Sequence, residues 1–236
     1  MTRFFIVLLI ACIGLQAHAD EKILSFHSDI QVAADGSMQV SETITVNAEG
    51  DRIQRGIYRD FPTDYADRYG NRVKVAFEPL EVSRDGRPEP WHSERLSNGT
   101  RVYFGSADVY LDSGEHTYVF RYRTTRQLGF FEDHDELYWN VTGNGWEFTI
   151  DQASASISLP ATVPPEQIKL EAYTGLQGGK GRNYESKLDS DGRGQFVTTR
   201  ALGPAQGLTI VESFPKGVVQ PPDSGQKLRW FVEDNR

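Results

Sequence analysis

An acidic run in the middle of the chain, Glu132-Asp133-His134-Asp135-Glu136, is the stretch best suited to metal binding. Carboxylate oxygens with one imidazole could hold Ca²⁺ or a weakly bound divalent ion. The spacing matches neither the twelve-residue EF-hand loop nor the His-Glu-x-x-His helix. Because carboxylates are mostly surface residues, we interpret the run as a solvated acidic loop. We expect no metal or other cofactor, and Asp133, His134 and Asp135 are only weak candidate ligands.

Nucleophilic catalysis has little support in the motifs. Cys12 is the one cysteine among 236 residues, and it lies in the N-terminal leader, so thiol chemistry and disulfides are excluded from the rest of the chain. His27, His92 and His116 stand singly, and their spacing leaves a Ser-His-Asp triad open. The sequence has no Gly-x-Ser-x-Gly elbow, no Walker loop and no dinucleotide-binding glycine motif.

We therefore predict that the protein is not an enzyme. The alternative is a secreted carbohydrate-binding or carbohydrate-active, hydrolytic protein. A glycoside hydrolase would need two carboxylates facing each other across a cleft, about 5 to 9.5 Å apart. The net charge of −8 argues against a nucleic-acid partner, since such proteins normally present a basic face.

One carboxylate falls on the apolar side of a predicted strand. Glu42 shares a face with Val40 and Ile44 at period two. A carboxylate in that place is unfavourable unless it is paired, exposed at a sheet edge or shifted outward by a bulge. A guanidinium can meet a carboxylate with two parallel hydrogen bonds. We hypothesise a structural ion pair between Glu42 and either Arg55 or Arg59, which would dock their segment on the sheet.

The segments that carry these residues have the alternating pattern of β-strands. In the central stretch 136–150, Trp139 lies on the apolar face of one strand, and Gly143-Asn144-Gly145 can reverse the chain so that Trp146 returns to the same core. Tyr118 and Phe120 share a face of another strand. Because rings bury large apolar areas, we place these four aromatic residues in the core.

We predict an all-β fold, an antiparallel β-sandwich with immunoglobulin-like character, over residues 20–215. Turn signals recur about every ten residues, as in sandwiches. Hairpins are expected at Asp35-Gly36 and Asn98-Gly99, and a long Gly-rich loop is expected over 175–194. No segment shows a convincing amphipathic helix.

Aromatic residues make up 11% of the chain, which raises the question of glycan or peptide binding. Most of them fall at buried positions of the strand pattern, so core packing is favoured. Tyr65, Tyr69, Phe130 and Phe131 are expected to be exposed.

Residues 1–19 have the pattern of a secretory signal peptide. A short cationic start precedes an apolar run over 4–15, and Ala17-His18-Ala19 supplies a small-x-small cleavage site. We expect cleavage after Ala19. The residues up to Cys12 also fit a bacterial lipobox, although Cys12 comes early and the apolar run continues beyond it, so lipoprotein processing is the alternative.

Residues 216–236 are expected to form a linker and juxtamembrane tail. The stretch 217–225 is rich in proline and glycine, which is typical of linkers. Trp230 and Phe231 follow it, and aromatic residues often sit at membrane interfaces. The alternative is a disordered or back-folded tail.

Four blocks appear in a characteristic order: the strand Val40–Ile44 with its Glu, Arg55-Gly-Ile-Tyr-Arg-Asp-Phe-Pro62, Tyr118-x-Phe-x-Tyr122, and Leu137-Tyr-Trp-Asn-Val-Thr-Gly-Asn-Gly-Trp146. Together they resemble the extracytoplasmic N-terminal domain of the YciQ-like predicted membrane proteins, a bacterial family of unknown function. The resemblance covers nearly the whole chain after the leader.

This resemblance implies a β-sandwich at the extracytoplasmic (periplasmic) face of the cytoplasmic membrane, followed by transmembrane helices. The membrane would be a partner through those helices, and an envelope protein is a further candidate partner. The sequence stops at Arg236, about where the first such helix would begin, so it is either truncated or a naturally short, secreted form. The family offers no catalytic residues. We expect a non-enzymatic interaction or sensing domain whose contact site is a surface groove or a sheet edge.

Overall fold

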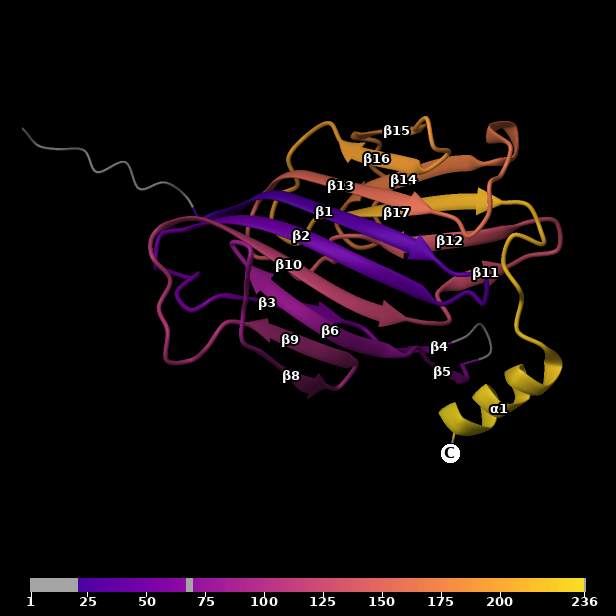
Figure 1. Ribbon diagram of the computed structural model, residues 1–236, viewed down its shortest axis with the longest axis horizontal. Helices are drawn as coiled ribbons and strands as arrows, with labels where there is room; N and C mark the ends of the chain where they lie inside the picture. The colour runs from indigo at the N-terminus through magenta and orange to yellow at the C-terminus, as the bar shows by residue number, and fades with distance from the viewer. Residues whose placement is uncertain (1–20, 67–69, 236) are drawn as a thin grey trace, which may run out of the picture.

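Strands dominate the computed structural model, which describes residues 21–66 and 70–235 (Figure 1). The predicted signal peptide, the lipobox alternative and Tyr69 lie outside the described residues. In chain order the elements are β1 (Lys22–Val32), β2 (Met38–Ala48), β3 (Ile57–Phe61), β4 (Asp64–Ala66), β5 (Arg72–Lys74), β6 (Phe77–Arg84), β7 (Arg87–Pro88), β8 (Trp91–Leu96), β9 (Gly99–Phe104), β10 (Gly114–Thr124), β11 (Leu128–Phe130), β12 (Asp135–Asn140), β13 (Ile150–Ser158), a 3-10 turn (Pro165–Gln167), β14 (Lys169–Gly175), β15 (Tyr184–Leu188), β16 (Gly194–Thr198), β17 (Gly207–Phe214) and α1 (Ser224–Asp234).

The strands form one large sheet and three smaller ones. The large sheet has the order β15-β16-β13-β1-β2-β10-β6-β7. The β12 sheet has the order β11-β12-β17-β14, the β3 sheet has the order β3-β9-β8, and β4 pairs with β5. The β1–β13 pair is parallel, whereas the other ladders are antiparallel. The mostly β class is confirmed. The immunoglobulin-like character is not confirmed, because the large sheet has eight strands and is mixed.

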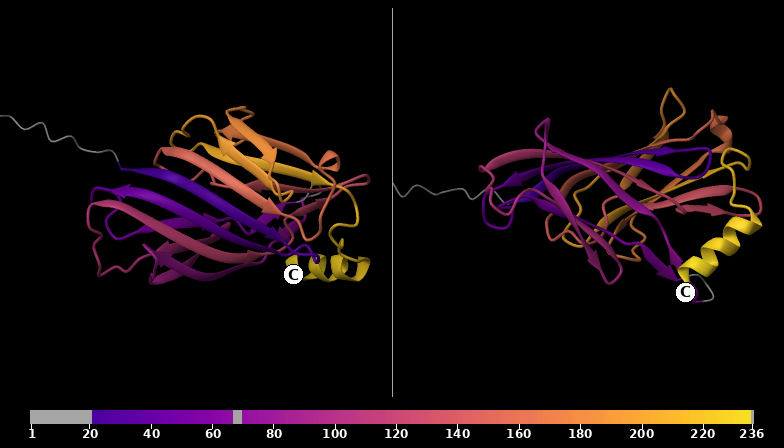
Figure 2. Two further views of the ribbon diagram at one scale, coloured as in Figure 1. Left: turned by 45° about the horizontal axis from the view of Figure 1, so that its top comes forward. Right: turned by 60° about the horizontal axis from the view of Figure 1, so that its bottom comes forward.

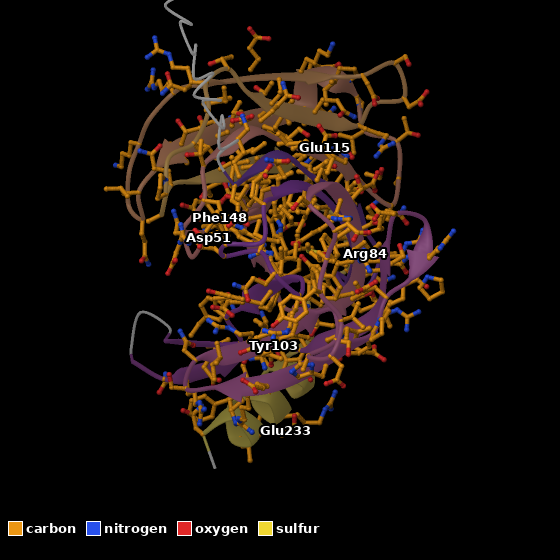
Figure 3. The ribbon with its side chains drawn as sticks, turned by 90° about the vertical axis from the view of Figure 1, so that its left-hand side faces the viewer. Asp51, Arg84, Tyr103, Glu115, Phe148 and Glu233 are labelled. Atoms are coloured by element: carbon orange, nitrogen blue, oxygen red, sulfur yellow. The ribbon has the colours of Figure 1, made fainter. Side chains whose placement is uncertain are left out.

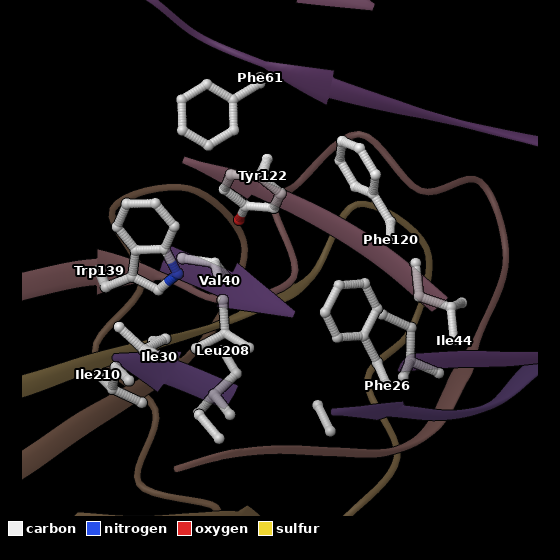
Figure 4. Packing of buried hydrophobic residues seen from close by; sticks show 14 of the residues in the cluster. Phe26, Ile30, Val40, Ile44, Phe61, Phe120, Tyr122, Trp139, Leu208 and Ile210 are labelled. Atoms are coloured by element: carbon white, nitrogen blue, oxygen red, sulfur yellow. The ribbon is translucent and has the colours of Figure 1, made fainter. Parts of the chain in front are cut away.

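The β12 sheet and the β3 sheet both pack on the large sheet. Trp139 and Leu208 of the β12 sheet lie beside Val40 and Ile30 of the large sheet (Figure 4). On the β3 sheet, the Phe104 ring lies 4.9 Å from the Phe120 ring of β10. The hydrophobic core therefore extends continuously along the large sheet, from the β12 sheet to the β3 sheet.

All four aromatic residues assigned to the core are buried: Tyr118, Phe120, Trp139 and Trp146. The hairpins predicted at Asp35-Gly36 and Asn98-Gly99 are also confirmed, as β1–β2 and β8–β9.

The prediction of a hairpin over the central stretch 136–150 was wrong. After β12 the chain does not fold back on it but crosses to the large sheet, where Ile150 pairs in parallel with Ile23. The indole N–H of Trp146 donates to the carbonyl oxygen of Thr142 at 2.8 Å, which closes this crossover. The glycines thus turn the chain between sheets.

Two further differences concern the C-terminal part. The expected Gly-rich loop contains β15, which pairs with β16 at the edge of the large sheet. The tail contains α1, whose first turn is capped by the Asp223 carboxylate accepting from the Gln226 amide at 2.7 Å. Carboxylate caps of this kind stabilise helix starts.

Replacing Gly56 with alanine is expected to lower the free energy of unfolding by about 2 kcal/mol or more. Gly56 precedes β3 at φ +135°, and a Cβ there would overlap the carbonyl oxygen of Phe104 in β9. Gly50 has φ +78° and open space, so Gly50→Ala should lose only about 1 kcal/mol from its conformation. Urea unfolding measures both, and equal losses would contradict the steric explanation.

Candidate functional site

Glu42 and Arg59 form a buried ion pair where three sheets meet. Glu42 comes from β2 of the large sheet and Arg59 from β3. The guanidinium binds the carboxylate through two hydrogen bonds, Nε to Oε2 at 2.9 Å and Nη2 to Oε1 at 3.0 Å. Nη2 also donates to the carbonyl oxygen of Val141, directly after β12, at 2.9 Å. One side chain therefore ties the large sheet, the β3 sheet and the β12 sheet together.

Neighbouring groups complete the pair. Tyr122 of β10 donates its hydroxyl to Oε1 of Glu42 at 2.8 Å. Burial, reinforced by that carboxylate, raises the pKa of Tyr122 well above its ordinary value, so the hydroxyl keeps its proton. Burial would lower the pKa of Arg59, but the attraction of Glu42 outweighs it and the pKa is raised. Tyr122 thus stays protonated and Arg59 stays positively charged, and these are the forms that donate the hydrogen bonds to Glu42.

Arg59, and not Arg55, is the partner of Glu42. The Arg55 guanidinium lies over the exposed Tyr110 ring, 4.1 Å from its centroid. Gly143 faces Arg59 at φ +73°, and a Cβ there would come within 2.8 Å of Nη1. The glycine therefore leaves the space that the guanidinium occupies.

A groove of about 860 Å³ opens beside this ion pair, and Arg59 and Gly143 both line it. One wall is β3 with the residue after it, at positions 58–62. The second wall is the end of β12, at positions 138–140. The groove continues over β14 to the glycine-rich stretch 175–179. It therefore lies between the β3 sheet and the β12 sheet.

Strand edges, rather than sheet faces, form these walls. Side chains alternate along a strand, so a sheet face contributes every second residue to a cleft. Here residues 58–62 and 138–140 line the groove consecutively. β3 is the last strand of its sheet, and β11 covers β12 only as far as Leu137. Among the described strands, none pairs with the open edge of β3 or with that side of residues 138–140.

The side chains around the groove are mainly aromatic and uncharged. Tyr138 is 58% exposed, and Tyr58 and Tyr65 are also exposed. Asn140 and Asn144 are hydrogen-bonded to each other at 2.8 Å. Tyrosine and asparagine offer apolar area with adaptable hydrogen bonds, which suits recognition of a flexible chain.

Asp60 is the carboxylate among the described lining residues. Both of its oxygens accept hydrogen bonds from Arg101, at 2.6 and 2.8 Å. The Arg101 guanidinium also lies 3.9 Å from the centroid of the Tyr58 ring. The carboxylate is therefore held on the outer side of β3 as part of a structural pair.

The acidic run does not converge on a metal site. Asp133 accepts from His134 at 2.7 Å in an exposed position. Asp135 turns inward instead, where Lys216 binds it at 2.5 Å. Within residues 21–66 and 70–235, no group of three or more His, Cys, Asp or Glu side chains is placed to hold a metal ion.

The histidines do not form a catalytic triad in the described part of the chain. His27 contacts the Ser154 hydroxyl through Nδ1 at 2.9 Å, but the nearby Asp29 carboxylate binds Arg193 and Ser156 instead. A triad needs a carboxylate that orients the imidazole, and this cluster does not supply one. His116 has such a carboxylate, with Asp85 2.9 Å from Nδ1, but its Nε2 is hydrogen-bonded to the carbonyl oxygen of Asp112 at 2.8 Å and not to a serine.

The exposed aromatic residues predicted from the sequence divide into two groups. Tyr65 is 45% exposed and lines the groove. Phe131 is exposed elsewhere and stacks on His134, and Phe130 is half-buried against the core. Tyr138 was not among the residues predicted to be exposed. It is the neighbour of the buried Trp139 on β12, and the alternation of side chains along a strand indicates that its ring faces solvent.

Glu212 is a buried carboxylate that has no hydrogen-bond partner among the described residues. It lies on β17 and is fully buried against Leu170 and Gly194. Burial alone raises its pKa to about 8, so it is largely protonated at neutral pH. Like Glu42, it interrupts an apolar face, here that of Ile210 and Phe214, and this pattern could have revealed it.

The chain is similar to known proteins in its sequence and in its fold. Residues 22–214 match the family described as "Predicted membrane protein (DUF2207) N-terminal domain". The chain belongs to this family. It is 29% identical to the uncharacterized protein YciQ of Escherichia coli over 212 residues, which are 90% of this chain. The chain spans 33% of the length of that relative.

Similar solved structures support the fold alone. A yeast LTA4 hydrolase in complex with bestatin has a TM-score of 0.51 and 13% identity, over 82% of this chain and 28% of the hydrolase. Native yeast LTA4 hydrolase has a TM-score of 0.50 and 12% identity, over 83% and 29%. At such low identity, the chemistry of these proteins is not transferred. Among the described residues, no helix has the length and apolar character needed to cross a membrane.

Proposed function

We propose that this chain is a non-enzymatic, extracytoplasmic interaction domain of a membrane protein. Its groove would bind an extended segment of a partner protein in the cell envelope. The observation that carries this proposal is a pair of strand edges, at residues 58–61 and 138–140, that both line the groove and that no described strand covers. An extended peptide can add to such an edge through main-chain hydrogen bonds.

The location is supported by the leader and by the family. Residues 1–19 have the order of a signal peptide. Membership of a family of predicted membrane proteins is consistent with a domain held at the membrane. The leader and the family together support placement at the outer face of the cytoplasmic membrane.

The non-enzymatic reading is supported by how the groove holds its charges. Asp60 is engaged by Arg101, and Arg59 is engaged by Glu42. Both pairs connect β-strands, so the tyrosine rings, the amides and Lys180, which also lines the groove, are left to meet a ligand. Such surfaces give affinity through aromatic anchors rather than through proton transfer.

Carbohydrate binding is the second candidate. Tyr58, Tyr65, Tyr138 and Tyr173 all line the groove, with Asn140 on the same side of the β12 sheet as Tyr138. Aromatic faces beside amides would also suit a sugar chain. A sugar, however, would make no use of the open strand edges, so we favour a peptide.

Selection of extended peptides from a random displayed library, using residues 20–236 as the target, tests the proposal. Tyr138→Ser is expected to weaken binding of a selected peptide about 10- to 30-fold, because an exposed aromatic anchor is lost. The matched control is Tyr110→Ser, which removes a 63% exposed tyrosine outside the groove. Calorimetric titration measures the dissociation constants.

Hydrogen exchange distinguishes the mode of binding. Bound peptide should slow exchange of amides within 57–61 and 138–140, since added main-chain bonds protect an edge. Equal binding by both variants would contradict the assignment of the groove. Binding of envelope oligosaccharides in place of peptides, without protection of those amides, would favour the carbohydrate alternative.

A further inference from the structure

Helix α1 presents an apolar stripe to solvent. Leu228 is 64% exposed, Phe231 is 49% exposed and Val232 is 39% exposed. Their spacing places them on one face of the helix. An amphipathic helix that packs on its own domain normally turns this face inward, so the direction of the stripe is unusual.

The opposite face of α1 is fastened to the domain. Arg126 holds the Asp234 carboxylate with two hydrogen bonds, at 3.2 and 2.7 Å. The same guanidinium lies over the Trp230 ring, 4.5 Å from its centroid. Asp234 also accepts from the Lys74 amide at 3.2 Å, and Asn235 exchanges hydrogen bonds with the backbone of Arg72. These contacts fix the rotation of the helix, and with it the outward direction of the stripe.

The helix lies at the periphery, where its outer face can meet a flat surface. It lies near β4 and β5 in Figure 1 and at the periphery of the molecule in both views of Figure 2, and it contacts β5. Figure 3 shows Glu233 of α1 at the lower margin of the molecule. Nothing in the described part of the chain covers Leu228, Phe231 or Val232.

Basic residues border the stripe on both sides. With 3.6 residues per turn, Lys227 and Arg229 each fall about 100° from the centre of the stripe. Asp234, which is the buried acid of the helix, is already neutralised by Arg126. The exposed acid, Glu233, falls about 150° from the centre of the stripe, on the side away from it. Lysine and arginine next to an apolar face can reach headgroups while their stems follow the apolar boundary.

We propose that α1 lies on the surface of a lipid bilayer, with Leu228, Phe231 and Val232 inserted and Lys227 and Arg229 at headgroup level. A bilayer suits this face better than a second protein. Three side chains fall far short of the roughly 800 Å² per partner of a stable protein interface. An interfacial helix needs only a narrow apolar face when the protein has another attachment, and the family is one of predicted membrane proteins.

This placement would orient the groove relative to the membrane. α1 contacts β5, β5 pairs with β4, and Tyr65 of β4 lines the groove. The proposal on α1 does not depend on what the groove binds.

Fluorescence of a single-site label tests the bilayer contact. Residues 20–236, which hold every described element, contain no cysteine, so Leu228→Cys and the control Val109→Cys can each be labelled at one site with an environment-sensitive dye. The probe is a vesicle of phosphatidylethanolamine with a minority of phosphatidylglycerol. We expect a blue shift at position 228 and none at position 109. Val109 is 51% exposed and lies in the loop between β9 and β10.

Removing the rest of the stripe should remove the contact. In the labelled Leu228→Cys protein, Phe231→Ser with Val232→Ser is expected to weaken vesicle binding at least about tenfold. Circular dichroism checks that the fold is kept. An unchanged emission at position 228 with vesicles would overturn the proposal. A blue shift that needs no lipid and grows with protein concentration would overturn it too, since it would indicate a second copy on the stripe.

Discussion

Replacing Arg59 with methionine is expected to lower the free energy of unfolding by about 3–5 kcal/mol, because the change leaves a buried carboxylate without its cation. Glu42 is fully buried and would keep only the Tyr122 hydroxyl of the contacts described above. The carbonyl oxygen of Val141 would also lose its donor. Urea denaturation followed by circular dichroism gives the free energy.

Arg101→Met is the matched control for this prediction. Arg101 also holds a carboxylate with two hydrogen bonds on the β3 sheet, but both members of that pair are partly exposed. Pairs in contact with solvent are typically worth about 0–1 kcal/mol, so Arg101→Met should have a small effect. If the two variants lost equal stability, burial would not be what makes the Glu42–Arg59 pair important.

Combining Arg59→Met with Glu42→Met separates the pair from its members. Removing both charges leaves no unpaired buried ion, so the double variant should be more stable than Arg59→Met alone. The coupling between the two substitutions is expected to be about 2 kcal/mol or more, within the range for groups in direct contact. Additive losses would instead indicate that the two side chains act through separate packing.

The ion pair could be anticipated because it breaks a local pattern. Glu42 stands where period two predicts an apolar residue. The pattern left open whether Glu42 is paired, exposed at a sheet edge or shifted by a bulge, and which arginine would reach it. Arg59 follows Ile57 and Tyr58 on an edge strand whose alternate residues face the core. Arg55 precedes that strand, so its side chain remains outside.

The groove could not be anticipated in the same way. Its walls, at residues 58–62 and 138–140, are nearly eighty positions apart in the chain and belong to different sheets. Only the packing of both small sheets on the large sheet brings them together. Sequence reasoning proposed a groove or a sheet edge in general, and the three-dimensional arrangement supplies both in one place.

The errors have a common physical cause, which is that distant partners override local signals. The glycines at 143–145 favour a tight reversal, but the parallel pairing of β13 with β1 draws the chain to another sheet. α1 was missed because the side chains that contact the domain, Trp230 and Asp234, include only one apolar residue. Its apolar residues point outward, so the usual pattern of an amphipathic surface helix is reversed.

Glu212 should make the stability of the protein fall as the pH rises. Its pKa is about 8 in the folded protein and its ordinary value is 4.5, so between these values the folded state binds more protons than the unfolded state. The stabilising contribution is fully present below about pH 4.5 and is lost as the pH rises to about 8. Each pH unit in that window lowers the free energy of unfolding by up to about 1.4 kcal/mol.

Glu212→Leu removes this dependence and fills the site with an apolar side chain. At pH 8 to 9 the variant is expected to be more stable than the parent by roughly 3–5 kcal/mol, and near pH 4.5 the two should be similar. The measurement is the difference between two urea-unfolding series over this range. Other titrating groups, including His116, whose hydrogen bond to Asp85 raises its pKa against the effect of burial, are present in both proteins and cancel in the difference.

Glu185→Gln serves as the comparison, because Glu185 is an exposed glutamate on β15. That variant should follow the parent at every pH. Gly194→Ala gives a second check on the same site, because a Cβ at Gly194 would overlap Oε2 of Glu212 and the buried carboxyl has nowhere to move. Gly194→Ala should therefore destabilise the parent more than it destabilises Glu212→Ala, where the space is free. A parent that holds its stability from pH 5 to 8 relative to Glu212→Leu would show that the carboxyl finds a partner or water in solution.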